Sequence, residues 1–173
     1  MSFNTRLLES IDIVAGLVPQ DFNTSATSDY ICLKNYEGVL VYFTKAAGTA
    51  GDDPSLQLYQ ASDVSGTGEK ALTFDNLYSK IGTQTGVNIW TKQTITATAD
   101  LDLQTPTDFV ADNVEASFVI DVRAATLDVS NGFDCLCFKN DGADIGNTSL
   151  AAVIFILYGA RYPSPIPLTA ITN

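Results

Sequence analysis

The feature that most constrains the fold of this chain is its longest apolar run, residues 150–158, with the sequence LAAVIFILY. The run is too short to cross a membrane as a helix, which needs about 20 apolar residues. A run of this length that is rich in Val, Ile and Phe is typical of a strand buried on both faces. It predicts the central strand of an all-β core. The segment 163–173 that follows carries Pro163, Pro165 and Pro167, and it predicts an extended tail because proline cannot donate a hydrogen bond to a sheet.

Short apolar or alternating segments, separated by turn-forming residues, continue through the chain from residue 29. The expected strands cover residues 30–34, 39–44, 56–61, 70–74, 94–99, 117–122, 133–138 and 150–158, with a hairpin or irregular pair within 76–92. Alternation points Leu72 and Phe74 towards the core and places Phe118, Ile120 and Val122 together on one face of a strand. The dipeptide Asn131-Gly132 predicts a hairpin turn. The whole pattern predicts an all-β fold, an antiparallel β-sandwich of jelly-roll-like type.

The N-terminal segment fits this pattern less well. Its apolar residues between Leu7 and Val18 recur at helical spacing, yet Ile11, Ile13 and Ala15 also alternate as in a strand. We expect residues 1–28 to form an extended or partly helical arm with a polar linker, and residues 29–173 to form the β-sandwich domain with its tail. The opening residues show no signal-peptide pattern, so we expect synthesis and retention inside a cell until release.

Composition excludes several classes of function. The net charge is −11, from 20 acidic and 9 basic residues, which disfavours binding to nucleic acid and to anionic membranes and favours a positively charged protein partner. Charged residues make up only 17% of the chain, against about 25% in a typical domain. The chain contains no histidine, which excludes Ser-His-Asp and Cys-His catalysis and histidine-dependent zinc sites. Carboxylate-only or lysine-based catalysis stays open in principle, but we expect no enzyme, no catalytic residue, no cofactor and no metal site.

The three cysteines, Cys32, Cys135 and Cys137, are too few and too unevenly spaced for a disulfide framework. On a strand, Cys135 and Cys137 point the same way, together with Phe133. The favoured interpretation is small buried residues on a core face, because free cysteine is commonly buried. A metal pair or a redox pair is the alternative. Reduced thiols are consistent with assembly in a cytosol.

Acidic residues cluster at Asp52-Asp53, at Asp100 with Asp102, and at Asp141 with Asp144. Paired carboxylates serve acid–base catalysis or calcium binding, but the spacing of Asp141 and Asp144 does not match a calcium loop. Solvated carboxylates that stabilise turns are the favoured interpretation. Calcium at one of these loops stays open.

Three further features have weaker functional alternatives. The segment Gly66-Thr-Gly68 lacks the glycine spacing and the following helix of a phosphate loop. Arg161, at the end of the apolar run, is expected to form a local salt bridge rather than to dock the tail on a neighbouring subunit. Trp90 is expected in the core, with a sugar-stacking platform as the alternative.

Four segments resemble small virion proteins encoded among the head genes of tailed bacteriophages. They are LKNYEGVLVYFTKAAGTAGDDPSL at 33–56, QASDVSGTGEKAL at 60–72, NGFDCL at 131–136 and LYGARYP at 157–163. The resemblance is one of general character, spread over roughly residues 30–165, and it transfers no site residue. It implies a non-enzymatic capsid decoration or cement protein on the virion surface, made in the host cytoplasm.

Such a protein binds the major capsid protein and stabilises the shell, and it acts as a homo-oligomer, with a trimer favoured because it suits three-fold positions. The chain ends would add contacts by ordering on binding. The alternatives are a phage neck or tail structural protein, and a carbohydrate-binding β-sandwich module.

Overall fold

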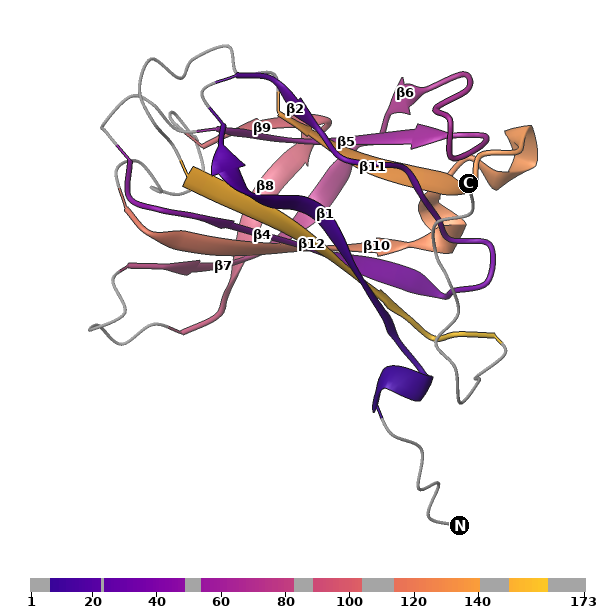
Figure 1. Cartoon of the computed structure of the whole chain (residues 1–173), viewed down its shortest axis with the longest axis horizontal. Coiled ribbons are helices and arrows are strands. Elements are labelled where there is room, and N and C mark those ends of the chain that lie inside the picture. The colour runs from indigo at the N-terminus through magenta and orange to yellow at the C-terminus, as the bar shows by residue number, and fades with distance from the viewer. Residues whose placement is uncertain are drawn as a thin grey trace.

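The computed structural model describes residues 7–22, 24–48, 54–82, 89–103, 114–140 and 150–161. Within them, two antiparallel sheets pack face to face, as Figure 1 shows, which confirms the predicted all-β sandwich. Sheet A contains, in spatial order, β1 (Asp12–Asp21), β12 (Leu150–Tyr158), β4 (Gly38–Lys45), β10 (Ala116–Arg123), β7 (Phe74–Ile81) and β8 (Thr91–Thr98). Sheet B contains β2 (Ala26–Thr27), β11 (Cys135–Asn140), β5 (Ser55–Ala61) and β6 (Lys70–Ala71), with β3 (Ile31–Cys32) beside β11 and β9 (Asp100–Asp102) beside β5. Three short 3-10 turns are η1 (Leu7–Glu9), η2 (Ala124–Thr126) and η3 (Val129–Asn131).

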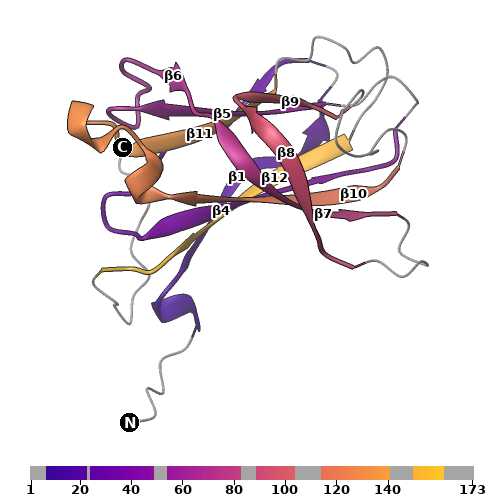
Figure 2. The same ribbon diagram turned by 180° about the vertical axis from the view of Figure 1, so that it is seen from behind.

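The antiparallel pairs are nested along the chain. Strand β1 pairs with β12, β2 and β3 pair with β11, β4 pairs with β10, and β5 pairs with β6 and β9. Nested pairs of this kind arise when one long antiparallel ribbon rolls up into two packed sheets, which is the jelly-roll arrangement. The β7–β8 hairpin is an addition that extends sheet A beyond β10, and it is in front in Figure 2.

Phe43 of β4 is the centre of the core between the sheets. Its ring centroid lies 5.7 Å from that of Phe138 in sheet B, 6.0 Å from that of Phe118 and 5.9 Å from that of Phe22. All four rings are fully buried. Leu72 and Phe74, which are predicted to face inward, are also buried, as are the three residues predicted to share one face: Phe118, Ile120 and Val122.

The apolar run at 150–158 forms a strand, as predicted, but the predicted burial of both faces is wrong. Strand β12 lies between β1 and β4, while β4 and β10 hold the middle of sheet A. The side chains of Val153, Phe155 and Leu157 are buried in the core. Those of Ile154 and Ile156 lie on the outer face of the sheet and are partly exposed.

The predicted arm over residues 1–28 is wrong for its second half. Residues 12–21 form β1, an edge strand that pairs with β12, and residues 26–27 form β2 in sheet B. Gly16 permits this pairing, because a Cβ atom there would lie 2.7 Å from Cε2 of Phe155. Residues 1–6, and the predicted tail at 163–173, lie outside the described residues.

The predicted hairpin turn at Asn131-Gly132 is also wrong. The strands before and after it, β10 and β11, belong to different sheets. The chain crosses between the sheets through η2 and η3, and Gly132 ends η3 with a left-handed φ of 84°. The hairpin or irregular pair predicted within 76–92 is only half right: β7 does form a hairpin, but its partner is β8, which corresponds to the strand predicted at 94–99.

Replacing Phe43 by alanine tests the central role of its ring. We expect Phe43→Ala to lower the free energy of unfolding by about 3–5 kcal/mol, because the substitution leaves a cavity where both sheets meet. Denaturant unfolding followed by fluorescence measures this loss. Val129→Ala is the control, because Val129 is 59% exposed on η3, and its effect should stay within about 0.5 kcal/mol. Equal losses in the two variants would contradict the packing described.

Candidate interaction surface

The outer face of sheet A carries apolar side chains on five neighbouring strands. Strand register places Ile13 beside Ile156 and Ile156 beside Leu40, and it places Ile154 between Ala15 and Tyr42. The second row continues from Tyr42 through Val119 to Tyr78. We call these eight residues the outer apolar face: Ile13, Ala15, Leu40, Tyr42, Tyr78, Val119, Ile154 and Ile156. All are at least partly exposed, with Ile13 at 52% and Tyr78 at 38%.

A polar border closes one end of the outer apolar face. The hydroxyl of Tyr158 donates to Oδ1 of Asp121 at 2.6 Å, and Nη1 of Arg123 donates to Oε1 of Glu37 at 2.8 Å. The Arg123 guanidinium also lies over the Tyr158 ring, 5.5 Å from its centroid. Burial and the hydrogen bond to Asp121 raise the pKa of Tyr158, so its hydroxyl stays protonated. This end is therefore lined by charged and aromatic groups that contact one another.

A second polar border closes the other end. The hydroxyls of Tyr42 and Ser117 lie 3.0 Å apart, and those of Thr44 and Ser117 lie 3.3 Å apart. A cavity of about 330 Å³ adjoins them and is lined partly by Pro19 and Leu150. An apolar centre within a polar border is the usual anatomy of a protein–protein interface.

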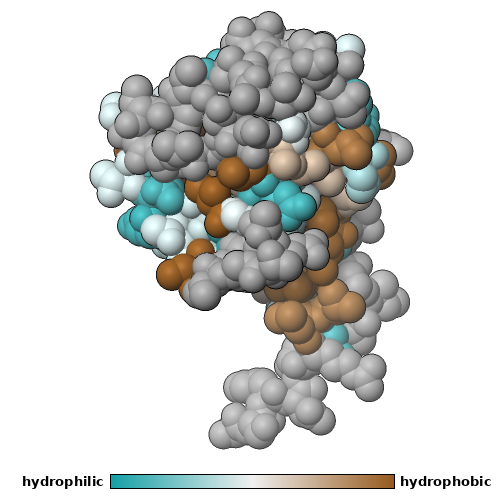
Figure 3. Space-filling model, turned by 90° about the vertical axis from the view of Figure 1, so that its left-hand side faces the viewer, coloured by the Kyte–Doolittle hydropathy of each residue, from teal (hydrophilic) through white to brown (hydrophobic). Residues whose placement is uncertain are grey.

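The apolar surface extends to the edge of the sheet at η1 and β1. Leu7 and Leu8 of η1 are 70% and 55% exposed, and Val18 of β1 is 64% exposed. Figure 3 shows hydrophobic residues gathered beside the N-terminal end. The edge itself is irregular, because β1 has register shifts on both sides of Leu17 and contains Pro19. Such features discourage the addition of a foreign strand, so this surface offers side chains rather than an open ladder.

The structure confirms that Cys135 and Cys137 are buried, but they do not face the main core. They lie on the outer face of sheet B with Tyr30 and Ala61, in a small second cluster. The β5–β6 turn covers this cluster, since Val64 packs against it. The side chains of β11 that alternate with these two cysteines point into the main core instead. The sequence did not reveal that Cys135 pairs across the strands with Cys32.

The two paired thiols differ in acidity. A hydrogen bond with Cys32, together with burial, raises the pKa of Cys135, while the same hydrogen bond lowers the pKa of Cys32. Cys32 is the more acidic of the two thiols, because its side chain is partly exposed and that of Cys135 is buried. Burial also raises the pKa of Cys137, to about 11.

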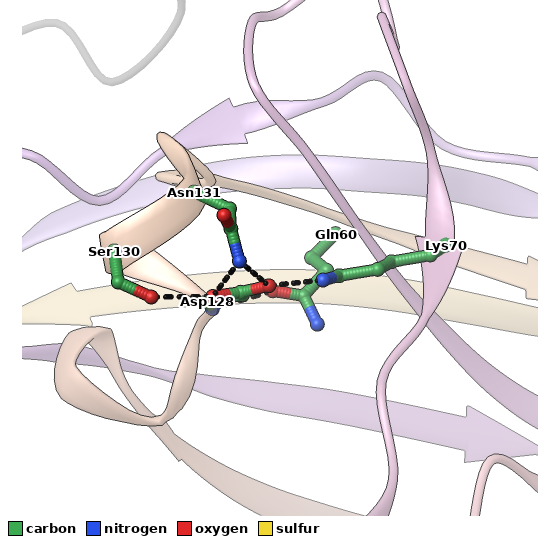
Figure 4. A network of polar contacts seen from close by, with 5 residues as sticks. All are labelled: Gln60, Lys70, Asp128, Ser130 and Asn131. Carbon is green, nitrogen blue, oxygen red and sulfur yellow. Dashed lines mark hydrogen bonds and ion pairs between the residues drawn. The ribbon is translucent and has the colours of Figure 1, made fainter.

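Asp128 is the carboxylate with the most prominent polar network, shown in Figure 4. It accepts hydrogen bonds from Lys70, from Ser130 Oγ at 2.9 Å and from Asn131 Nδ2 at 2.8 and 3.0 Å. Its main-chain N–H donates to Gln60 Oε1 at 2.8 Å. These contacts, that of Lys70 first, lower the pKa of Asp128 to about 2. The network joins the crossing segment at η3 to β5 and β6, so its role is structural.

The predicted acidic sites receive little support. Asp52, Asp53, Asp141 and Asp144 lie outside the described residues. Asp100 and Asp102 stand at the two ends of β9, and the suggestion of calcium there stays a prediction.

The remaining predicted features are placed as follows. Gly66 and Gly68 belong to the turn between β5 and β6 and have positive φ angles of 81° and 65°, so they serve a hairpin rather than a phosphate loop. The main-chain N–H of Arg161 donates to the Asn35 carbonyl at 2.9 Å. No salt bridge of Arg161 is found with any described residue. Trp90 is 48% exposed, so its predicted place in the core is wrong.

Asp128→Asn tests the carboxylate network through its pH dependence. Because folding lowers the pKa of Asp128 from 3.8 to about 2, ionisation of Asp128 stabilises the fold above about pH 4, and this contribution disappears as the pH falls through about 2. We expect the wild type to unfold at a higher urea concentration than Asp128→Asn at pH 6. The difference between the two proteins should shrink towards pH 2. A difference that is equal at both pH values would contradict this role.

Among the described residues, no helix has the length and the apolar composition needed to cross a membrane. No family model, no curated protein and no solved structure matches this chain. The function is therefore inferred from the geometry of the chain itself and from the resemblance of its segments.

Proposed function

We propose that this chain is a non-enzymatic virion protein of the decoration or cement type, which binds the major capsid protein through the outer apolar face. The observation that carries the proposal is the row-by-row placement of partly exposed apolar side chains on sheet A, from Ile13 at its edge to Tyr78. Monomers rarely expose contiguous apolar patches of large size unless the patch is functional. The segments that resemble phage virion proteins are the reason for proposing the major capsid protein as the partner.

Binding would work by burial of this face. Removing one Ile side chain from water is worth about 1.5–3 kcal/mol, so a few such residues suffice for a specific contact once the cost of association is met. A specific interface buries more than about 1,000 Å² in total. The net charge of −11 suits a capsid surface that is locally positive.

The fold offers an analogy only. Jelly rolls occur in viral capsid proteins and in lectins, but a fold does not determine a function. We expect a homo-oligomer, with a trimer at three-fold positions of the shell favoured. Many copies over the capsid surface would distinguish a decoration protein from a neck or tail protein, which would form a single ring at one vertex.

Ile13→Asp tests the docking face. Capsids prepared without this protein would be mixed with the purified wild type or variant and sedimented. We expect the charge to weaken co-sedimentation at least about tenfold, because a carboxylate at an apolar interface loses its hydration without a partner. Val129→Asp is the matched control, because Val129 is similarly exposed but lies on η3. It should bind as the wild type does.

Capsids that carry the wild type should also withstand higher temperature than bare capsids. Equal binding by Ile13→Asp and the wild type would rule out the outer apolar face as the docking surface. Unchanged heat resistance would rule out the cement role even if binding occurs.

A second candidate function, a carbohydrate-binding module, is favoured by one observation. Trp90 and Ile89, directly before β8, are 48% and 66% exposed, and exposed aromatic rings can stack on sugars. We expect Trp90→Ala to abolish retention on a polysaccharide column if this function holds, with the thermal midpoint unchanged. Absence of wild-type retention on a panel of polysaccharides would exclude it.

A further inference from the structure

Two thiols and one carboxylate, drawn from distant parts of the sequence, meet at the start of β11. The Sγ atoms of Cys32 and Cys135 and a carboxylate oxygen of Asp134 all lie within 4.8 Å of one another. Register pairs Cys32 of β3 directly with Cys135 of β11. The Cys135 thiol already donates to Oδ1 of Asp134 at 3.2 Å. Both sulfur atoms therefore face the same small space as the carboxylate.

We propose that Cys32, Asp134 and Cys135 bind one thiophilic divalent cation of the zinc class. Tetrahedral zinc has Zn–S distances of about 2.3 Å and Zn–O distances of about 2.0–2.2 Å, which places its ligand atoms roughly 3.3–3.8 Å apart. The three atoms already lie within 4.8 Å of one another, so they need to approach by at most about 1.5 Å to reach that spacing. Two sulfur ligands select zinc over calcium and magnesium, which prefer oxygen ligands.

The surroundings favour binding of a cation. Cys135 is buried, whereas Cys32 and Asp134 are partly exposed. Because Cys32 and Asp134 are partly exposed, and Asp134 also lines a cavity of about 500 Å³, a cation can reach these two ligands from solvent. The main chain of Lys34 forms a hydrogen bond with the Cys32 thiol, and outer contacts of this type orient metal ligands.

Binding exchanges protons for the metal. The cation takes the place of the thiol protons of Cys32 and Cys135, which pass to solvent, and no electron is transferred. Three ligands from the chain leave a fourth position for water, as in open zinc sites. The metal would also tie β3 to β11. This pairing rests on only two register positions, Cys135 with Cys32 and Leu136 with Ile31.

Cys137 provides the matched control. It is buried on the same face of β11, two residues from Cys135, yet it does not belong to the three-residue group. A variant at this position also removes one thiol and disturbs the same cluster, but it leaves the proposed ligands in place.

The test uses the full chain, reduced and freed of metal, with Co²⁺ as the spectroscopic probe and Zn²⁺ as its competitor. We expect one Co²⁺ per chain, with a thiolate-to-cobalt charge-transfer band that Zn²⁺ abolishes. Cys32→Ser, at a partly exposed position, should lose the band, and Asp134→Asn should weaken binding at least about tenfold. Cys137→Ala should keep the band. Circular dichroism of each variant verifies that it folds.

Hydrogen exchange supplies a second readout in the wild type. Zn²⁺ should slow the exchange of amides in residues 31–33, because the metal holds β3 on β11. The proposal is overturned if Co²⁺ gives no thiolate band, if Cys32→Ser keeps the band, or if Cys137→Ala loses it while folded. It is also overturned if peptide mapping of protein purified with an alkylating agent finds Cys32 and Cys135 joined as a disulfide.

Discussion

The packing of the two inner sheet faces around Phe43 is the interaction on which the rest of the structure depends. Its ring contacts the rings of Phe22, Phe118 and Phe138, and the stacked contact with Phe138 joins sheet A to sheet B. Sheets buried on one face only can hold their strands in register because a slip of one residue would turn every inner side chain outward. Burial of this core therefore also holds the nested strand pairs in place, including the pair of β1 with β12.

The outer faces of the two sheets are used differently. Sheet B covers part of its own outer face with the β5–β6 turn, so Tyr30, Cys135 and Cys137 form a second small cluster. Sheet A presents Ile13, Ile154 and Ile156 on its outer face, at least partly exposed to solvent. A partly exposed apolar surface of this extent gains free energy when a partner covers it. The two proposals made above therefore concern opposite sides of the sandwich and stand independently of each other.

Polar groups reinforce the places where the strands alone are weak. The Asp128 network fixes the crossing between sheets, where the chain has only short 3-10 turns. The pairing of β3 with β11 covers two positions, and the proposed cation site lies there. Exposed ion pairs contribute little to stability by themselves, so their value lies in holding local geometry.

Period-two alternation in the sequence determined that this chain is a β-sandwich, where most strands lie, and that residues such as Leu72 and Phe118 are buried. It did so because side-chain direction in a strand depends only on local position. The assignment of residues 12–21 needed the tertiary structure, because their apolar residues fit both helix and strand periods. The outer apolar face, and the meeting of Cys32 with Asp134 and Cys135, also became visible only in the tertiary structure. These depend on strand order and register between distant segments, which the burial of a shared core decides and local sequence does not record.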